Sequence, residues 1–195
     1  MSRLDPRSPT VFGTVELGRR PGSMVETQRT LTLPEPTGTE VLAVPAGAPI
    51  EVEVRMESMM EGILVTGSAR ATAEGACVRC LEPLTVAIDA PFQELFVYPE
   101  RAAHSRKTGA MDEDTPEYEV IDDHIDLGPV VVDAVVPTLP FQPVCRPDCP
   151  GLCSECGFRM ADDPDHAHEL LDPRWSALAS LATSDGSESP QEKRN

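Results

Sequence analysis

The six cysteines of this chain fall into three close pairs, and that spacing suits metal binding. The pairs are Cys77 with Cys80, Cys145 with Cys149, and Cys153 with Cys156. A Zn²⁺ ion prefers a tetrahedron of thiolate or imidazole ligands, and two cysteines separated by about two to four residues can occupy one edge of it. The pattern therefore predicts metal sites, and free thiols are the alternative.

Two histidines, His166 and His168, follow the last pair and are further candidate ligands. Eight candidates divide into two sets of four. The division that we favour is Cys77, Cys80, Cys145 and Cys149 for one ion, and Cys153, Cys156, His166 and His168 for the other. The second set is local, so its loop closes at small entropic cost, whereas the first crosslinks distant parts of the chain. The histidines could instead be exposed side chains of an acidic loop, and this alternative stays open.

Two arginines, Arg79 and Arg146, lie within the segments that carry the first cysteine set. A zinc ion with four thiolates has a net negative charge, which is unfavourable in an acidic protein. We expect both arginines to offset that charge and to donate hydrogen bonds to the sulfur atoms.

No catalytic constellation accompanies the cysteines. The sequence contains no phosphate-binding loop, Gly-rich dinucleotide fingerprint, HExxH or G-x-S-x-G motif, and no small-molecule substrate is evident. A redox role for Cys77 and Cys80 is disfavoured, because this pair lies between two predicted strands and not at the start of a helix. Four filled ligand positions leave no open site on a metal. We therefore predict one or two structural zinc ions and no enzymatic activity.

Alternation of apolar and polar residues predicts the strands that position the first cysteine pair. The predicted strands are 29–36, 50–56, 63–73 and a run that begins at Leu84. The last three form an antiparallel meander, with Cys77 and Cys80 in its second connection. Helical spacing of valines between residues 125 and 140 predicts a helix that prolines soon end. The predicted fold is α+β: an antiparallel β-meander or partly open barrel with a few short helices, stapled by structural zinc.

The remaining segments define the expected domain organisation. We expect a flexible N-terminus over residues 1–14 and a zinc-binding domain over 15–182. Within that domain, residues 99–119 are a predicted mobile acidic insertion. A short amphipathic helix over 172–181 either docks on the core or binds a partner. Residues 183–195 have no core-forming side chains and are predicted to be a disordered tail.

The charge of the chain limits its partners. The formal net charge is −17, so broad binding to nucleic acid is disfavoured and a basic partner suits the acidic body; the alternative is a surface without an electrostatic role. Arg19 and Arg20 could contact a partner such as RNA locally, or be two solvated arginines. The sequence has neither a signal peptide nor an apolar run long enough to span a membrane, which favours a reducing cytoplasm, where thiols outnumber disulfides.

Five motifs in a fixed order resemble one known family. They are ELGRRPGSM (16–24), ESMMEGILVTG (57–67), CVRCL (77–81), IDLGPVVVDAVVPTLP (125–140) and CRPDCPGLCSECG (145–157). Their order and spacing are similar to those of the YceD family, the large ribosomal RNA subunit accumulation proteins, in an actinobacterial form. The resemblance covers about residues 15–180, and its most specific feature is CxRCL combined with a late GLCxxCG.

The resemblance implies a non-catalytic factor in the synthesis, processing or stability of large-subunit ribosomal RNA. A large-subunit ribosomal protein or precursor ribosomal RNA is the implied partner. It also supports the grouping of Cys77 and Cys80 with Cys145 and Cys149. Many relatives have a CxC pair where this chain has His166 and His168, and imidazole is an ordinary substitute for thiolate. Two other functions stay open: a zinc-ribbon interaction module outside ribosome assembly, and a metal-dependent RNA hydrolase with an open metal position.

Overall fold

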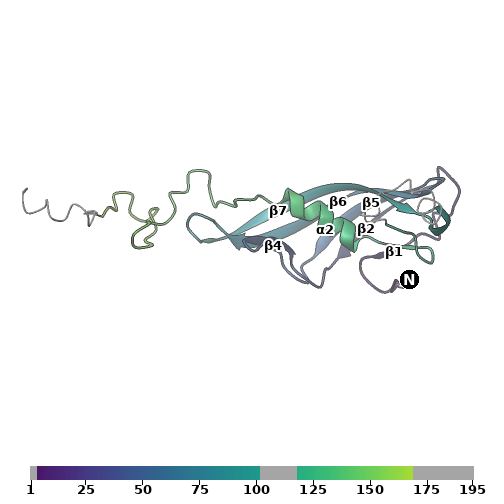
Figure 1. The fold of residues 1–195 in the computed structure, drawn as a ribbon, viewed down its shortest axis with the longest axis horizontal. Coiled ribbons are helices and arrows are strands. Elements are labelled where there is room, and N and C mark those ends of the chain that lie inside the picture. The colour runs from purple at the N-terminus through teal and green to yellow at the C-terminus, as the bar shows by residue number, and fades with distance from the viewer. Residues whose placement is uncertain (1–3, 102–117, 169–195) are drawn as a thin grey trace, which may run out of the picture. The chain divides into compact units, whose positions relative to one another are not determined.

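The computed structural model of this protein describes residues 4–101 and 118–168 (Figure 1). Two compact units divide the chain between Cys149 and Pro150, and each is described by itself. The predicted helix over 172–181 and the tail from 183 lie outside the described residues, as do residues 102–117 of the predicted insertion. None of the described helices is long and apolar enough to cross a lipid bilayer.

The first unit is built on antiparallel sheets. Its strands are β1 (Val11–Gly13), β2 (Met24–Leu31), β3 (Thr37–Gly38), β4 (Leu42–Val44), β5 (Ile50–Ser58), β6 (Gly62–Ala76), β7 (Pro83–Val97) and β8 (His124–Asp126), and its complete helix is α2 (Gly128–Thr138). In the main sheet β2 pairs with β5, β5 with β6 and β6 with β7, while β4 continues along the edge of β6 beyond β5 and pairs with β3. β1 and β8 form a separate two-stranded sheet.

The three-stranded meander of β5, β6 and β7 confirms the sequence prediction. In β5 the apolar residues Val52, Val54 and Met56 are buried and the residues between them are exposed or half-buried, as period-two alternation requires. The sheet stays open in the described residues, since β2 and β7 each have only one strand partner along the main sheet. The partly open barrel is therefore better described as an open, mostly β architecture.

The predicted strand over 29–36 was placed too late in the chain. The observed strand β2 runs from Met24 to Leu31 and pairs with the whole of β5, from Met24 opposite Glu57 to Leu31 opposite Ile50. Its early part is rich in polar residues, so its periodicity is weak, and Pro34 and Pro36 cannot donate the hydrogen bonds of a continuing ladder.

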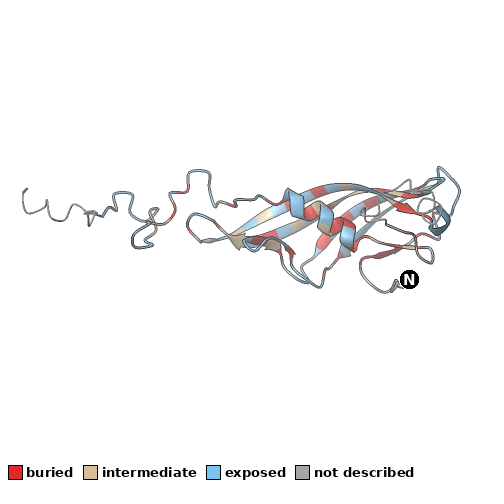
Figure 2. Cartoon of the chain, viewed as in Figure 1, coloured by how far each residue is buried: buried red, intermediate tan, exposed pale blue. Residues whose placement is uncertain are grey.

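The helix α2 lies across one face of the main sheet (Figure 1) and contacts β7, β3 and β6. Pro129 occupies its first turn, where a missing N–H costs nothing, and Val130, Val131 and Val135 are buried. The helix ends at Thr138, after Pro137 and before Pro140, as predicted. The buried residues of the main sheet and of α2 are coloured red in Figure 2.

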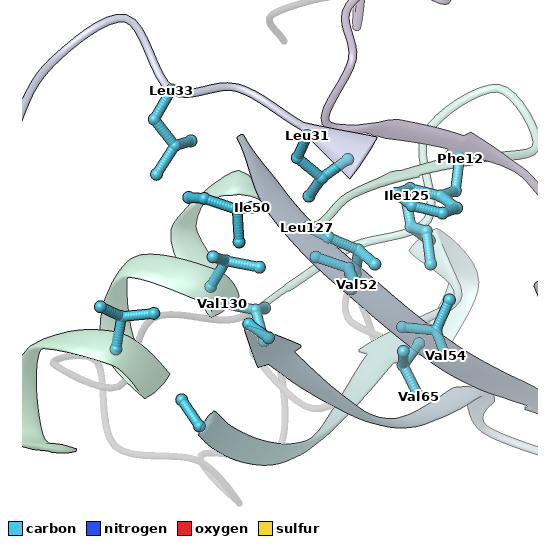
Figure 3. Close-up of a cluster of buried hydrophobic side chains, with 14 of the residues drawn as sticks. Phe12, Leu31, Leu33, Ile50, Val52, Val54, Val65, Ile125, Leu127 and Val130 are labelled. Carbon is cyan, nitrogen blue, oxygen red and sulfur yellow. The ribbon is translucent and has the colours of Figure 1, made fainter. Parts of the chain in front are cut away.

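The core between helix and sheet consists mainly of aliphatic side chains (Figure 3). Its largest fully buried members are Phe12, Phe96, Leu31, Leu42, Ile50, Ile63, Ile125 and Leu127. Phe12 comes from β1 and Ile125 from β8, so the small sheet contributes to the same cluster as β5 and β6. The cluster includes residues of β6 and β7, the two strands whose connection carries the first cysteine pair.

Candidate metal centres

The first cluster joins two segments that are far apart in the sequence. Cys77 and Cys80 lie in the connection between β6 and β7, and Cys145 and Cys149 lie in the segment after α2. The Sγ atoms of Cys77 and Cys149 are 3.9 Å apart, and those of Cys80 and Cys145 are 3.7 Å apart. All four sulfur atoms lie within 4.8 Å of one another. The structure thus brings together the four cysteines that the sequence analysis assigned to one set.

A tight hairpin of backbone hydrogen bonds presents the first two thiols. The Leu81 N–H donates to the Cys77 carbonyl at 2.9 Å, and the Cys77 N–H donates to the Glu82 carbonyl at 2.8 Å. Leu81 has a φ of 61°, in the left-handed region that favours glycine. The Val78 N–H donates to the Pro143 carbonyl at 2.9 Å, which holds this hairpin against the segment that carries Cys145.

Arg79 and Arg146, the two arginines near the first cluster, have different contacts. Arg79 donates from Nη1 to the carbonyl oxygens of Pro147 and Cys149, at 3.3 and 3.0 Å. It therefore fixes the backbone that carries Cys149, and within the described residues no hydrogen bond joins Arg79 to a sulfur atom. Arg146 is exposed and lies 3.5 Å from Asp148. The Arg79 guanidinium thus adds positive charge beside the backbone of Cys149.

The environment of the first cluster favours loss of a proton from one thiol and opposes loss from another. Burial raises the pKa of Cys77, but nearby backbone N–H groups, led by that of Cys145, outweigh burial and lower this pKa to about 6. The pKa of Cys145 is raised to about 12, first by its hydrogen bond with the Cys149 thiol and then by burial. Four thiols this close cannot all become thiolates without a cation among them.

The distances fit a tetrahedral ion and exclude a disulfide. Zn–S bonds of about 2.3 Å give a tetrahedron with edges of about 3.8 Å, and the measured separations lie on either side of that value. A disulfide needs about 2.05 Å between sulfur atoms, and all six cysteines are free. The donor set and its spacing therefore suit a soft divalent metal ion.

The second cluster lies within residues 150–168. Cys153, Cys156, His166 and His168 place their ligand atoms within 4.8 Å of one another. The Cys156 Sγ is 3.2 Å from the Nε2 atoms of both histidines, which are 2.9 Å from each other. The His166 ring also stacks on Phe158, with centroids 4.6 Å apart. The two histidines are thus oriented toward Cys156, and this set too could hold a metal ion.

Both clusters use the same local hairpin. The Gly157 N–H donates to the Cys153 carbonyl at 2.9 Å, and the Cys153 N–H donates to the Phe158 carbonyl at 2.7 Å, the same pattern as in the first cluster. Gly157, with a φ of 72°, occupies the place that Leu81 has there. Sequence reasoning missed the left-handed backbone of Leu81. The available signal was that glycine follows Cys156, whereas leucine follows Cys80 at the matching position.

The two clusters differ in burial. Cys77, Cys80 and Cys149 are buried and attached to the main core, whereas Cys156 and His168 are exposed. Among residues 150–168 the only buried residue is Gly151. The second segment therefore has no apolar core in its described part, and its order depends on the cluster and on backbone hydrogen bonds.

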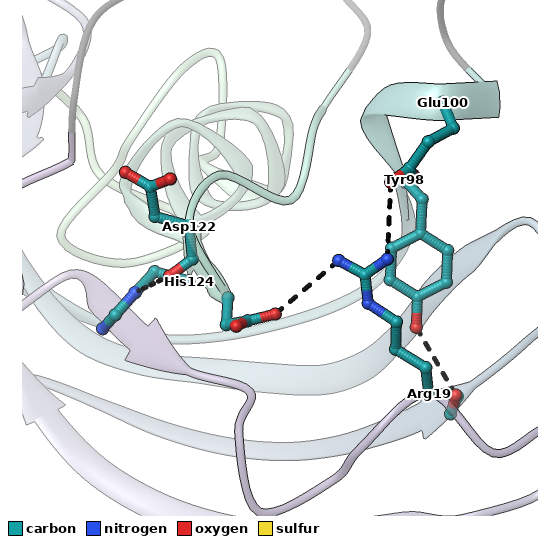
Figure 4. Close-up of polar contacts among 7 residues, drawn as sticks. Arg19, Tyr98, Glu100, Asp122 and His124 are labelled. Atoms are coloured by element: carbon teal, nitrogen blue, oxygen red, sulfur yellow. Dashed lines mark hydrogen bonds and ion pairs between the residues drawn. The ribbon is translucent and has the colours of Figure 1, made fainter.

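Arg19, for which the sequence left open a partner contact or a solvated side chain, has several contacts within the chain (Figure 4). Its guanidinium lies 4.9 Å from the centre of the Tyr98 ring, 3.5 Å from Glu100 and 3.8 Å from Asp123. Arg20 is exposed, and no contact of its side chain is found in the part of the chain that the structure describes. Only Arg20 of this pair is therefore free to meet a partner without breaking an internal contact.

The comparison with protein families matches the part of the chain that carries both clusters. The model of the family described as "Large ribosomal RNA subunit accumulation protein YceD" matches residues 65–182, a range that contains both clusters. The chain belongs to the YceD family. Within this family, an uncharacterized protein of Mycobacterium tuberculosis and one of Mycobacterium bovis are each 44% identical to it over 177 residues, which are 89% of this chain and 82% of theirs.

A third relative has similar coverage at a lower identity. An uncharacterized protein of Mycobacterium leprae is 39% identical over 178 residues, 91% of this chain and 80% of its own. No solved structure matches the chain. Membership of the YceD family connects the protein with accumulation of the large ribosomal subunit RNA.

Proposed function

We propose that this YceD-family protein is a non-catalytic cytoplasmic factor in the synthesis, processing or stability of large-subunit ribosomal RNA. It acts by binding a basic large-subunit ribosomal protein or precursor ribosomal RNA. The observation that carries the proposal is the family match over residues 65–182, which includes both four-residue clusters. The absence of a catalytic motif from the sequence supports a binding role.

We further propose that both clusters hold structural zinc. Cys77, Cys80, Cys145 and Cys149 are the ligands of the first site, and Cys153, Cys156, His166 and His168 are those of the second. Zinc at such sites supplies fixed tetrahedral bonds between backbone segments. The sulfur separations of 3.7 and 3.9 Å support the first site. Elemental analysis of the purified protein tests this, and two zinc ions per chain is the expected result.

The charge of the protein favours a basic protein over RNA as the main partner. A net charge of −17 repels phosphate backbones and attracts basic ribosomal proteins. Arg20, which is exposed and has no side-chain partner in the described part of the chain, is the residue that we assign to a local RNA contact.

Affinity capture from growing bacteria tests the proposed function. The tagged protein is expected to enrich precursors of the large-subunit RNA and one or more basic large-subunit proteins, relative to a tagged acidic control protein. Depletion of the protein is expected to lower the ratio of large to small subunits in sucrose gradients. Capture without enrichment of large-subunit components, together with an unchanged subunit ratio, would contradict the proposal.

A separate measurement tests the RNA hydrolase alternative. A hydrolytic metal needs an open position for water, whereas a structural site has four protein ligands. The absorption spectrum of the cobalt-substituted protein is expected to show tetrahedral coordination by cysteine at the first site. A spectrum of five- or six-coordinate cobalt would favour the hydrolase.

A further inference from the structure

The main sheet has a second face, turned away from the core. On β5 the residues Glu51, Glu53 and Arg55 alternate with the buried ones and are exposed. An antiparallel sheet with one solvated face normally carries polar side chains there. The residues of β5 named above follow that rule, whereas apolar side chains are exposed at the end of the sheet near the β5–β6 loop.

In the middle of this face, Glu53, Arg70 and Asp89 are paired within the chain. Arg70 donates from Nη1 and Nη2 to the two carboxylate oxygens of Glu53, at 3.0 and 3.3 Å. Gln28 also donates to Glu53 at 3.4 Å, and the Arg70 guanidinium lies 3.7 Å from Asp89. The charges of Glu53, Arg70 and Asp89 are therefore compensated by one another.

At the end of the sheet near the β5–β6 loop, one cross-strand row is mainly apolar. Met24 lies opposite Glu57, Glu57 opposite Leu64, and Leu64 opposite Leu95. We call these four residues the Met24 row. Met24 is 51% exposed, and the two leucines are half-buried although they face away from the core. The adjoining β5–β6 loop adds Met60, which is 72% exposed. Exposed apolar side chains gathered in this way mark interaction sites.

Glu57 is the one charged member of the Met24 row, and it has no partner among the residues that the structure describes. Within the described residues, no hydrogen bond or ion pair involves its carboxylate. Arg55, the nearest basic residue along β5 on this face, lies opposite Glu26 in the next row. Glu57 is half-buried as a residue and lies between Met24 and Leu64, so the side chains on both sides of it in this row are apolar and offer no donor. Its environment therefore favours a cation supplied from outside.

We propose that the Met24 row and the β5–β6 loop dock a basic amphipathic segment of a protein partner. The apolar side chains of that segment contact Met24, Leu64 and Leu95, and one Lys or Arg pairs with Glu57. Flexible methionine side chains suit such a contact, because they adapt to differently shaped partners. RNA does not suit it, since phosphates would lie beside Glu57, Glu26 and Glu61.

This surface deepens the proposed function and rests on it for the biological identity of the partner. The binding chemistry can be tested without that identity. The probe is a synthetic amphipathic peptide composed only of Leu and Lys, and a peptide with Ser in place of Leu has the same charge and serves as its control. The protein carries ¹³C-labelled methionine methyl groups, so each methionine reports on its own surroundings.

The Leu–Lys peptide is expected to shift the methyl signals of Met24, Met59 and Met60. Those of the buried Met56 and of Met160, in the other unit, are expected to change little. The Ser–Lys peptide is expected to cause much smaller shifts, because it lacks the apolar contacts. Equal shifts at Met160, or none at Met24, overturn the proposal. So does a preference of these signals for a single-stranded RNA oligonucleotide over the peptide.

A matched pair of variants tests the role of Glu57. Glu57→Gln and Glu51→Gln remove the same charge from the same face of β5, but only the first lies in the Met24 row. Glu57→Gln is expected to weaken binding of the Leu–Lys peptide about tenfold, as loss of a charge-assisted hydrogen bond predicts. Glu51→Gln is expected to change it by less than about twofold. Equal effects overturn the proposal, and thermal unfolding of both variants checks that the fold is retained.

Capture from cells separates this proposal from the proposed function. If the unmutated protein enriches large-subunit precursors and Glu57→Gln enriches them equally, the docking surface is wrong and the function stands. If the unmutated protein enriches none, the function is wrong, and the peptide titration still decides the docking surface. A selective loss of basic proteins with Glu57→Gln, but not with Glu51→Gln, supports both.

Discussion

The Sγ atoms of Cys80 and Cys145 lie 3.7 Å apart, although 65 positions separate these residues in the sequence. Cys80 follows β6, and Cys145 follows α2, so this contact joins the turn of the meander to the segment behind the helix. Closing so long a loop costs chain entropy. A metal ion bound to these thiolates would contribute its binding energy directly to the free energy of unfolding.

We therefore expect Cys80→Ser to lower the free energy of unfolding by about 3 kcal/mol or more, because the four-cysteine site loses its metal and its crosslink. The measurement is chemical or thermal unfolding of the purified variant, combined with its zinc content. One zinc ion per chain should remain, at the second cluster. Unchanged unfolding together with unchanged zinc content would show that this site is not a structural crosslink.

Cys156→Ser is the corresponding change in the second cluster. The first unit has its own core and its own four thiols, so its unfolding should change by less than about 0.5 kcal/mol. Residues 150–168 have almost nothing else to order them, and their amide hydrogens should exchange much faster in the variant. Zinc content, hydrogen exchange and thermal unfolding measure these effects. Equal destabilisation of both units would contradict the independence of the two clusters.

Local sequence patterns predicted several strands and the helix, whereas the pairing of distant strands determines which side chains become neighbours. The alternation around Val52 and the helical spacing around Val131 are local signals, and both were confirmed as a strand and a helix. The placement of Glu57 between Met24 and Leu64 depends on the register of three strands, which the sequence does not encode locally. The left-handed φ of Leu81 was also missed, because residue type alone predicts such a φ only for glycine. Here the tertiary structure imposes that backbone conformation on a leucine.

Leu81→Gly tests the strain at that position. A leucine in the left-handed region costs about 1–2 kcal/mol, and the extra backbone freedom of glycine in the unfolded chain offsets about half of that. The Leu81 side chain is 65% exposed, so its removal loses little burial. We expect the free energy of unfolding to be unchanged or to rise by up to about 1 kcal/mol. Leu81→Val is the control, and it should be destabilising because a β-branched residue tolerates this conformation poorly.

The free energy of unfolding of both variants is measured by denaturant unfolding of the zinc-loaded proteins. A clear loss of stability in Leu81→Gly would mean that the leucine side chain contributes packing that outweighs its backbone strain. Gly157 has the same position in the second hairpin, so Gly157→Leu should reproduce the strain there and loosen the second cluster.

Tyr118 gives a prediction about alkaline pH. Its hydroxyl donates to Asp133 Oδ2 at 2.7 Å, and burial, followed by Asp133 and Glu94, raises its pKa above the ordinary value of 10.0. A raised pKa in the folded state means that this group stabilises the fold fully below pH about 10, and that the contribution is lost as pH rises through the folded pKa. Tyr118→Phe should therefore cost about 1 kcal/mol at neutral pH. The difference in free energy of unfolding between the two proteins should shrink above pH about 10, and a constant difference up to strongly alkaline pH would contradict the role of this hydroxyl.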